Sequence, residues 1–398
     1  MTVNISLCLI VKDETAFLEG CLDSVRGLVD ETVIVDTGST DGTQELARAR
    51  ADVYGEVDFD GDFSAARNAA LARASGSWVL FLDADERLPP EQHEPLRRFL
   101  EDAGPQVLAG RLLRYNFFST GGFYTGRELK VFRRLPEIRY QRRVNESVSA
   151  SIEELGGQVA AAPVVMNHVG HGRPVEARDA KAGRYLALMA EQMRERGPDP
   201  VLVAYRGLIE RTLGHFGDAL DQTAEALRIG ADLPVVWLFR GHVLRSVGDR
   251  AGALDAYEEG LRRAPGNAAL HNMAGVAMLE LGRAEPAALA FDRARQLDPQ
   301  LLHTDINLGL VAQSEGRWDE AVERYLAAGG ANRAFWADAW EGRVERDPYR
   351  AFYNETVLGY AGLGYHAGYC LLRSAGGSMT DAAAALRGLA GAGVPARP

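Results

Sequence analysis

Apolar and polar positions follow a regular alternation along the first ninety residues. Short runs rich in apolar and β-branched residues predict strands at residues 5–11, 32–35, 53–57 and 78–82. The segments between these runs predict helices, and in the first of them apolar residues recur at helical spacing. Alternating strands and helices are typical of a parallel α/β sheet.

The pattern changes after residue 87. A helix is predicted for residues 90–100, followed by strands at residues 107–116, 128–132, 140–149 and 164–168. We expect antiparallel partners among these later strands, at the edge of the sheet. The sequence therefore predicts a mixed, Rossmann-like α/β domain over residues 1–175.

From about residue 177 the pattern is helical only, and a 34-residue repeat governs it. Four positions of the repeat keep a similar kind of residue in all four units, and we call each such set of equivalent residues a column. A fifth column, of proline, ends the two middle units. The columns are Gly207, Gly241, Gly275 and Gly309; Gly214, Gly248, Gly282 and Gly316; Ala219, Ala253, Ala287 and Ala321; Thr223, Tyr257, Phe291 and Tyr325; and Pro265 and Pro299. This is the period of tetratricopeptide repeats, in which helix pairs stack into a superhelix. We predict an all-α domain over residues 176–398, with four units at about 200–335, capping helices on both sides and less regular helices at 335–391.

Composition narrows the function. A length of 398 residues favours two domains. A net charge of −11 argues against a nucleic-acid partner and against docking on anionic membranes. With only three lysines (Lys12, Lys130 and Lys181), any phosphate group must be bound by arginine or by a metal ion. The three cysteines show no metal-ligand spacing.

No apolar stretch approaches membrane-spanning length, and the first strand begins within a few residues of Met1. We therefore expect a cytoplasmic protein with no transmembrane segment and no signal peptide.

Carboxylates end the predicted strands. Asp83 and Asp85 follow the run at 78–82, Asp36 follows the run at 32–35, and two further acids follow the first strand. Ligands of such sheets bind beyond the carboxyl ends of the strands, and carboxylates there are suitable ligands for Mg²⁺ or Mn²⁺. The alternative is a simple strand-ending turn, because Asp58 and Asp60 show the same spacing without a long buried strand before them.

Several motifs carry a family resemblance. They read S-L-C-L-I-V-K-D-E, V-I-V-D-T-G-S-T-D-G-T, D-F-S-A-A-R-N and F-L-D-A-D, with K-V-F-R, V-N-E-S and N-H-V-G-H further on. In this order they resemble the family 2 glycosyltransferases with a GT-A fold, up to about residue 172. With the repeats added, the chain is similar to the sublancin-type peptide S-glycosyltransferases.

The resemblance implies site residues. Asp85 would coordinate Mn²⁺ or Mg²⁺, and Asp83 would face the ribose or the metal. Asp36 would contact the base or the ribose, although Thr37 stands where the family commonly has a second acid. The remaining implied contacts are Ile10 and Lys12 at the base pocket, Arg67 at the nucleotide and His168 in the metal shell. The alternatives are a surface ion pair for Arg67 and a core or loop position for His168.

The resemblance also implies a catalytic base. Glu146 lies in V-N-E-S, where related sequences have a His-Glu pair and this chain has Asn145 in place of the histidine. The alternative is an ion pair of Glu146 with Arg142 or Arg143. Because a hydroxyl needs more help from a base than a thiol does, the missing histidine leaves the acceptor atom open.

The function expected from these features is a metal-dependent, inverting transfer of a sugar from a UDP-sugar to a peptide or protein held by the repeats. Acceptor contacts are predicted for Arg211, His242, Arg245 and Asn272, with ordinary solvated faces as the alternative. Two other functions stay open. One is transfer to a saccharide or lipid-linked glycan, with the repeats serving assembly, for example as a homodimer. The other is a scaffold with a degenerate transferase domain.

Overall fold

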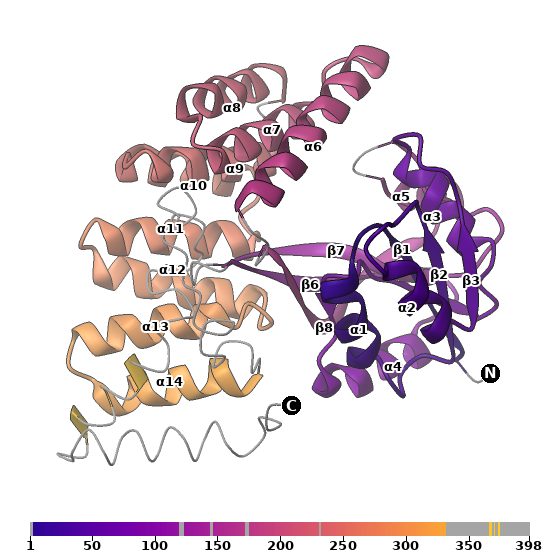
Figure 1. The fold of residues 1–398 in the computed structure, drawn as a ribbon. Coiled ribbons are helices and arrows are strands. Elements are labelled where there is room, and N and C mark those ends of the chain that lie inside the picture. Colours follow the sequence, from indigo (N-terminus) through magenta and orange to yellow (C-terminus); the bar gives the residue numbers. More distant parts are fainter. Residues whose placement is uncertain are drawn as a thin grey trace. The chain divides into compact units, whose positions relative to one another are not determined.

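The computed structural model describes residues 3–118, 123–143, 146–171, 175–230 and 232–331, together with 366, 367, 370, 373 and 374. The chain divides into two compact units (Figure 1). One comprises Met1–Phe117 with Thr125–Arg196, and the other comprises Phe118–Tyr124 with Gly197–Pro398. Helix α6 (Val175–Arg196) thus belongs to the first unit, whereas we predicted the boundary at residue 175. Apart from the last five positions above, the helices predicted at 335–391 lie outside the described residues.

The first unit is built on one eight-stranded mixed sheet with the order β3-β2-β1-β4-β7-β6-β8-β5. The strands are β1 (Ile5–Val11), β2 (Glu31–Asp36), β3 (Val53–Glu56), β4 (Trp78–Phe81), β5 (Glu86–Arg87), β6 (Val107–Phe118), β7 (Phe123–Arg133) and β8 (Gln158–His171). Strands β1 to β4 pair in parallel, while β7 pairs antiparallel with β4 and β5 pairs antiparallel with β8. The predicted change from parallel to antiparallel pairing is confirmed.

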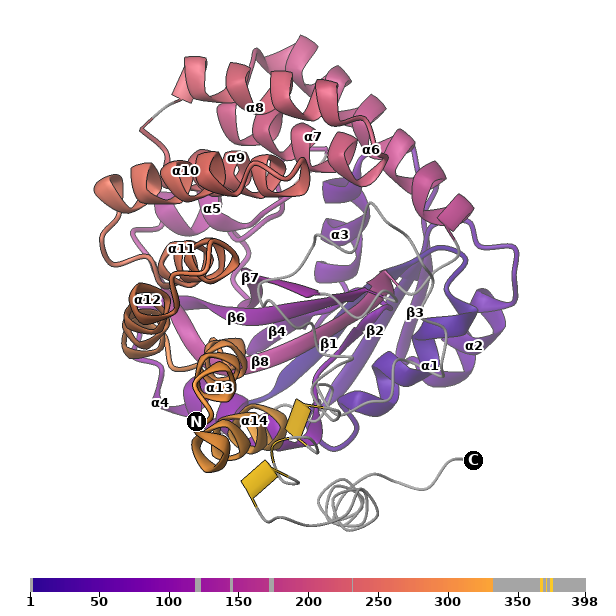
Figure 2. The ribbon, with the colours of Figure 1, turned by 90° about the vertical axis from the view of Figure 1, so that its left-hand side faces the viewer.

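Helices cover both faces of the sheet (Figure 2). They are α1 (Thr15–Ser24), α2 (Thr43–Arg50), α3 (Phe63–Leu71), α4 (His93–Asp102) and α5 (Ser149–Glu154), with a 3₁₀ turn η1 (Pro90–Gln92). Leu7 and Leu9 of β1 join a core with α1 and α4, whereas Cys8, between them, joins a core with α3 and α5. Successive side chains of a strand point to opposite faces, so β1 is buried on both.

The predicted strand at residues 140–149 is wrong for the described part of that segment. It contains only an isolated bridge between Gln141 and Ser147, and α5 begins at Ser149. The segment bonds to the start of α3 instead: Phe63 N donates to the Arg143 carbonyl at 3.1 Å, and Arg142 has a φ of 80°. A left-handed residue interrupts an extended strand, which explains the difference.

The second unit confirms the repeat. Its paired helices are α7 (Pro200–Thr212) with α8 (Phe216–Gly230), α9 (Pro234–Ser246) with α10 (Arg250–Arg263), α11 (Ala268–Glu280) with α12 (Ala284–Leu297), and α13 (His303–Ser314) with α14 (Trp318–Ala331). A Cβ at Gly241 would lie 2.2 Å from the Tyr257 ring, and equivalent close approaches occur at Gly275 and Gly309. The first glycine column is therefore required where the two helices of a pair cross. The second column supplies positive φ between them, for example 85° at Gly248.

Candidate active site at the carboxyl ends of the parallel strands

The ends of three parallel strands lie next to one another. Val11 of β1 is opposite Asp36 of β2, and Cys8 of β1 is opposite Phe81 of β4. Because Asp83 follows Phe81 by two residues, this register brings Asp36 and Asp83 to the same edge, on either side of β1. The crevice predicted from the strand-end carboxylates is therefore present as an arrangement of the backbone.

Asp36 is fully buried, and only one of its two carboxylate oxygens accepts hydrogen bonds from the described residues. Its Oδ1 accepts from the backbone N–H groups of Gly38 and Ser39, both at 2.8 Å, and from Gln44 Nε2 at 3.3 Å. Its Oδ2 is buried and accepts no hydrogen bond from the residues that the structure describes. An unmet acceptor on a buried carboxylate is costly, so Oδ2 is suited to a ligand that donates an N–H or O–H.

The end of β1 places the two residues predicted to line the base pocket. Ile10 is half-buried and packs against the core that contains Val33 and Val35, while Lys12 is exposed. The following turn is tied to the turn after β2, since Asp13 Oδ1 accepts from the Thr40 N–H at 2.8 Å. The structure brings Ile10 and Lys12 to the same edge as Asp36; their contact with a nucleotide stays a prediction.

Arg67 links two carboxylates. Its Nη2 donates to Asp83 Oδ1 at 2.9 Å, and its Nε donates to Glu146 Oε1 at 2.7 Å. The guanidinium carbon lies 4.7 Å from the centre of the Phe81 ring and 5.5 Å from that of Tyr140. Arg67 is therefore a largely buried bridge held between two aromatic rings, rather than a member of a surface ion pair.

Among the described residues, Glu146 forms its ion pair with Arg67 and none with Arg142 or Arg143. Its side chain is 13% exposed and lines a small polar cavity of about 210 Å³. The cavity is lined by Arg111, Glu128, Leu129, Tyr140, Glu146, Ser147 and Val148. Glu146 is thus a carboxylate at the wall of a polar cavity, oriented by a buried guanidinium, and its role as a general base stays a prediction.

Four further charged residues complete the cluster, and the sequence analysis did not place them in the site. Lys130 Nζ lies 2.7 Å from Glu86 Oε2 and 3.3 Å from Asp83 Oδ2. Arg114 Nη1 donates to Glu86 Oε1 at 3.1 Å, and its Nη2 lies 3.1 Å from Glu128 Oε1. Glu86 directly follows the D-A-D motif, and Lys130 lies in K-V-F-R, so both were visible in the quoted motifs.

The cations dominate the electrostatics of Asp83. Burial would raise the pKa of its carboxyl group, but Lys130 and Arg67 together hold that pKa well below the usual range. Burial likewise would lower the pKa of Lys130, and the carboxylates of Asp83 and Glu86 outweigh it, so that the pKa rises. Both groups are therefore charged at neutral pH.

Asp85 and His168 meet where β5 pairs with β8. His168 Nε2 lies 3.3 Å from Asp85 Oδ1, and both side chains are largely buried. A Cβ at Gly170 would lie 2.0 Å from Asp85 Oδ2 and 3.0 Å from His168 Nε2. The Asp85 carboxylate thus occupies the space that a side chain at position 170 would need. It lies beside an imidazole, and a carboxylate with an imidazole is a pair of ligands that suits Mn²⁺ and is acceptable to Mg²⁺.

Acids and cations are interleaved in the described part of the cluster. The acids are Asp83, Asp85, Glu86, Glu128 and Glu146, and the cations paired with them are Arg67, Arg114 and Lys130. Two more arginines lie close enough to act on these acids, Arg87 on Asp85 and Arg111 on Glu128.

Two of the predicted acceptor residues lie deep in the second unit. Arg211 is fully buried and donates from Nη1 to the His242 carbonyl at 3.2 Å. His242 Nδ1 lies 3.3 Å from the Tyr257 hydroxyl, and burial, with Arg211 and Arg245 adding to it, lowers the pKa of His242 well below its ordinary value. The imidazole is therefore neutral.

The other two predicted acceptor residues are also buried. Arg245 forms a bidentate pair with Glu280, with Nε–Oε2 at 3.0 Å and Nη2–Oε1 at 2.5 Å. Asn272 accepts from Asn307 Nδ2 at 2.9 Å. The contacts of Arg211, Arg245 and Asn272 join neighbouring repeats, and an acceptor role for any of the four residues stays a prediction.

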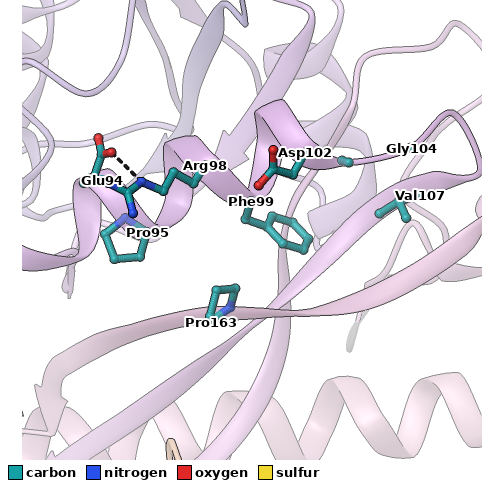
Figure 3. A pocket seen from close by; sticks show the side chains of 9 residues that line it. Glu94, Pro95, Arg98, Phe99, Asp102, Gly104, Val107 and Pro163 are labelled. Carbon is teal, nitrogen blue, oxygen red and sulfur yellow. Dashed lines mark hydrogen bonds and ion pairs between the residues drawn. The ribbon is translucent and has the colours of Figure 1, made fainter.

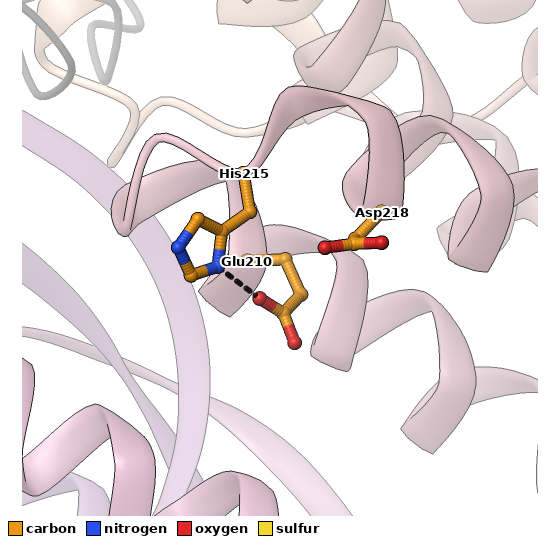
Figure 4. A group of neighbouring side chains, drawn as sticks. All are labelled: Glu210, His215 and Asp218. Carbon is orange, nitrogen blue, oxygen red and sulfur yellow. Dashed lines mark hydrogen bonds and ion pairs between the residues drawn. The ribbon is translucent and has the colours of Figure 1, made fainter.

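The described residues form two other features that resemble binding sites. A cavity of about 530 Å³ lies beside α4, where Phe99, Val107 and Pro163 form an apolar lining (Figure 3). Near the turn between α7 and α8, Glu210, His215 and Asp218 bring their ligand atoms within 4.8 Å of one another (Figure 4). His215 already pairs with Glu210 at 2.8 Å, and two of the three side chains are exposed. Neither feature adjoins the strand-end carboxylates in sequence.

Within the described ranges, no helix combines the length and the apolarity that a bilayer-spanning segment requires.

Known proteins resemble parts of the chain. Residues 6–153 match the family described as Glycosyl transferase family 2. A TPR repeat-containing protein of Synechococcus elongatus is 40% identical over 176 residues, which are 43% of this chain and 43% of that protein. The lipopolysaccharide core biosynthesis glycosyltransferase LpsC of Rhizobium meliloti is 30% identical over 205 residues, which are 49% of this chain and 74% of LpsC.

Two further similarities are more limited. The SPbeta prophage-derived glycosyltransferase SunS of Bacillus subtilis is 34% identical over 88 residues, which are 21% of this chain and 20% of SunS. The crystal structure of TTC0263, a thermophilic TPR protein of Thermus thermophilus, aligns with a TM-score of 0.35 and 21% identity, covering 41% of this chain and 94% of that one. The chain thus spans less than half of the Synechococcus relative but most of LpsC. With the family match over the sheet unit and the similarity to LpsC, the chain belongs to glycosyl transferase family 2.

Proposed function

We propose that the chain is a metal-dependent, inverting glycosyltransferase that moves a sugar from a nucleoside diphosphate, with UDP as the expected nucleotide, to a side chain of a peptide or protein. The observation that carries this proposal is the carboxylate cluster at the ends of β2 and β4. Asp36 keeps a buried acceptor for a ligand donor, and the carboxylate of Asp85 lies beside the imidazole of His168. A nucleoside diphosphate with its metal ion matches both features, because its base or ribose can donate to Asp36 and its metal ion suits a carboxylate with an imidazole.

Each residue has a part in this mechanism. Asp85 and His168 would hold Mn²⁺ or Mg²⁺, which when bound neutralises charge on the departing diphosphate. Asp36 Oδ2 accepts a hydrogen bond from the base or the ribose. Glu146 takes the proton of the acceptor as the new bond to the sugar carbon forms and the bond from that carbon to the diphosphate breaks. Arg67 orients Glu146 through the 2.7 Å contact.

Two acceptor classes are supported by different observations. The four stacked helix pairs favour a peptide or protein, because such arrays commonly bind extended chains on an inner surface. The similarity to LpsC, a lipopolysaccharide core biosynthesis glycosyltransferase, supports a saccharide acceptor as the second candidate. In that case the repeats would serve assembly, for which a homodimer is the simplest form.

The donor reaction can be tested without knowing the acceptor. The full chain is incubated with Mn²⁺ and a panel of nucleotide sugars, and release of the nucleoside diphosphate is measured. We expect slow hydrolysis of at least one UDP-sugar. EDTA should abolish it because it removes the metal ion, and Asp85→Asn should abolish it because it removes a charged ligand with little change in side-chain volume. Asp58→Asn is the matched control, since Asp58 has the same D-x-D spacing but lies exposed in a loop. Full turnover without metal would refute metal dependence, and absence of any hydrolysis or nucleotide binding would refute the transferase.

The acceptor class needs a separate experiment. Candidate peptides and lipid-linked saccharides are incubated with the active donor, and a mass increase of one sugar is sought in each. If the repeats hold a peptide, Arg211→Ala and Arg245→Ala should raise the KM for that peptide while donor hydrolysis is unchanged. Because both arginines are buried, thermal unfolding of each variant is measured alongside. If only the saccharides gain a sugar, the acceptor is a saccharide and the peptide proposal is refuted.

A further inference from the structure

The two aspartates of the D-A-D motif have unlike surroundings. The Asp83 side chain is held by two cations, with Arg67 on Oδ1 at 2.9 Å and Lys130 on Oδ2 at 3.3 Å. Asp85 lies 3.3 Å from the imidazole of His168, and its carboxylate packs against Gly170, where a Cβ would lie 2.0 Å from Oδ2. A divalent cation is therefore repelled from Asp83 by two positive charges, whereas the neighbour that is recorded for the Asp85 carboxylate is an imidazole, which can itself be a metal ligand.

Lys130 is positioned specifically for this contact. It lies on β7, one residue before Val131, which is opposite Leu80 of β4. Its side chain is 8% exposed, so the ammonium has left most of its water, which costs free energy unless carboxylates replace it. Glu86, which is fully buried, contacts the same ammonium at 2.7 Å and also accepts from the Asp83 N–H at 2.9 Å. Glu86 thus fixes Lys130 and the backbone of Asp83 together.

We propose that Lys130 is a positioning residue that prevents Asp83 from binding the divalent cation before the nucleotide arrives. The inference rests on the proposed function. Without the nucleotide, the cation finds one carboxylate and one imidazole, Asp85 and His168, and is held weakly. The diphosphate of the donor supplies the remaining oxygen ligands, so the cation and the donor are retained together. Lys130 thereby makes metal binding depend on the donor.

The test measures Mn²⁺ binding directly, by electron paramagnetic resonance of the free ion and by calorimetry, with and without UDP. Wild type should bind Mn²⁺ much more tightly when UDP is present. Lys130→Met should tighten nucleotide-free Mn²⁺ binding on the order of tenfold, because it removes a unit charge and releases Asp83 Oδ2. Lys130→Arg should behave as wild type. Damage to the fold would weaken binding, so the expected change is opposite in sign to a merely structural effect.

Three further variants separate the cause of any gain. Arg114→Met removes one positive charge from the same cluster, yet the partners of Asp83 are Arg67 and Lys130, so it should give no comparable gain. Adding Asp83→Asn to Lys130→Met should abolish the gain. If Lys130→Met fails to fold with Glu86 buried opposite it, Lys130→Met with Glu86→Gln keeps the net charge and still releases Asp83 Oδ2, and the gain is expected there.

The outcomes are distinguishable. Unchanged or weaker nucleotide-free Mn²⁺ binding in the folded variants that lack Lys130 overturns the role of Lys130. So does an equal gain in Arg114→Met, or a gain that survives Asp83→Asn. If wild type binds no Mn²⁺ even with UDP, the metal-dependent function falls, and the role of Lys130 falls with it.

Discussion

The change Glu146→Gln separates a catalytic carboxylate from a structural one. Glutamine has almost the same volume and keeps an oxygen that can accept from Arg67 Nε, so the contact now 2.7 Å long can persist. The substitution removes the charge and with it the ability to take a proton. Donor and metal contacts lie on Asp36, Asp85 and His168 in our proposal, so nucleotide affinity should be preserved.

The expected magnitudes follow from this geometry. Loss of a general base lowers kcat by roughly 10²–10⁴-fold, which corresponds to about 3–5 kcal/mol of transition-state stabilisation. The structural loss should be smaller, about 1 kcal/mol, because a charge-assisted hydrogen bond to Arg67 becomes an ordinary one. A base therefore gives a large kinetic effect with a small effect on stability, whereas a purely structural partner gives the reverse.

The assay uses the UDP-sugar found active in the donor panel and follows UDP release at saturating donor, with UDP affinity and thermal unfolding measured on the same preparation. Arg98→Met is the control for nonspecific effects of a substitution. Arg98 is 71% exposed, and its ion pair with Glu94 on α4 contributes little to stability. A kcat within threefold of wild type would refute the reasoning and return Glu146 to a structural role. Glu128, which lines the same cavity, would then be the next candidate for the general base.

Three further predictions concern the architecture around the site. Arg67→Met should destabilise the sheet unit by about 3–5 kcal/mol at neutral pH, as measured by hydrogen exchange in β4 and α3, because two carboxylates lose a buried partner. The pKa of Asp83 is depressed in the folded state, so the stability that this carboxylate contributes is present above its unfolded pKa of about 4 and is lost as the pH falls below that value. The difference in stability between Arg67→Met and wild type should therefore shrink below about pH 4. A difference that stays constant with pH would contradict the pairing of Arg67 with an ionised Asp83. Gly170→Ala should weaken Mn²⁺ binding in the presence of UDP, because the added methyl meets the Asp85 carboxylate, and unchanged binding would remove this glycine from the metal site. Gly241→Ala should cost about 1–3 kcal/mol in the thermal unfolding of the repeats, since the methyl overlaps the ring it faces, and an unchanged transition would contradict that packing.

Much of the fold follows from local pattern. The parallel strands are continuous apolar runs, and the repeat columns are set by contacts that recur every 34 residues, so both are legible in the sequence. The segment at 140–149 was misjudged because its apolar and polar residues suit a strand. Its backbone is held instead by α3, far away in the chain. Asn68 Nδ2, for example, donates to the Tyr140 carbonyl at 3.0 Å across 72 positions.

The strand-end acids of the site were predictable for the same reason, since each directly follows an apolar run. Their partners were not. Lys130 contacts Asp83 across 47 positions, and Glu146 contacts Arg67 across 79. Nothing local marks such pairs, because they depend on the antiparallel order of β7 beside β4 and on the turn before α5. The net charge of −11 for the whole chain likewise gives no indication that three cations, Arg67, Arg114 and Lys130, lie together at one site.

The sheet order has a consequence for synthesis of the chain. Strands β1 to β4 lie within the first 81 residues and can pair as soon as they emerge, but β5 pairs with β8, and His168 follows Asp85 by 83 positions. Contacts of such separation form late, and domains fold from the N-terminus as they are made. A nascent chain that ends between residues 86 and 145 thus has the strand-end aspartates but neither the proposed base nor the imidazole. Under the proposed mechanism, we expect a chain that terminates prematurely in this range to leave the donor sugar intact.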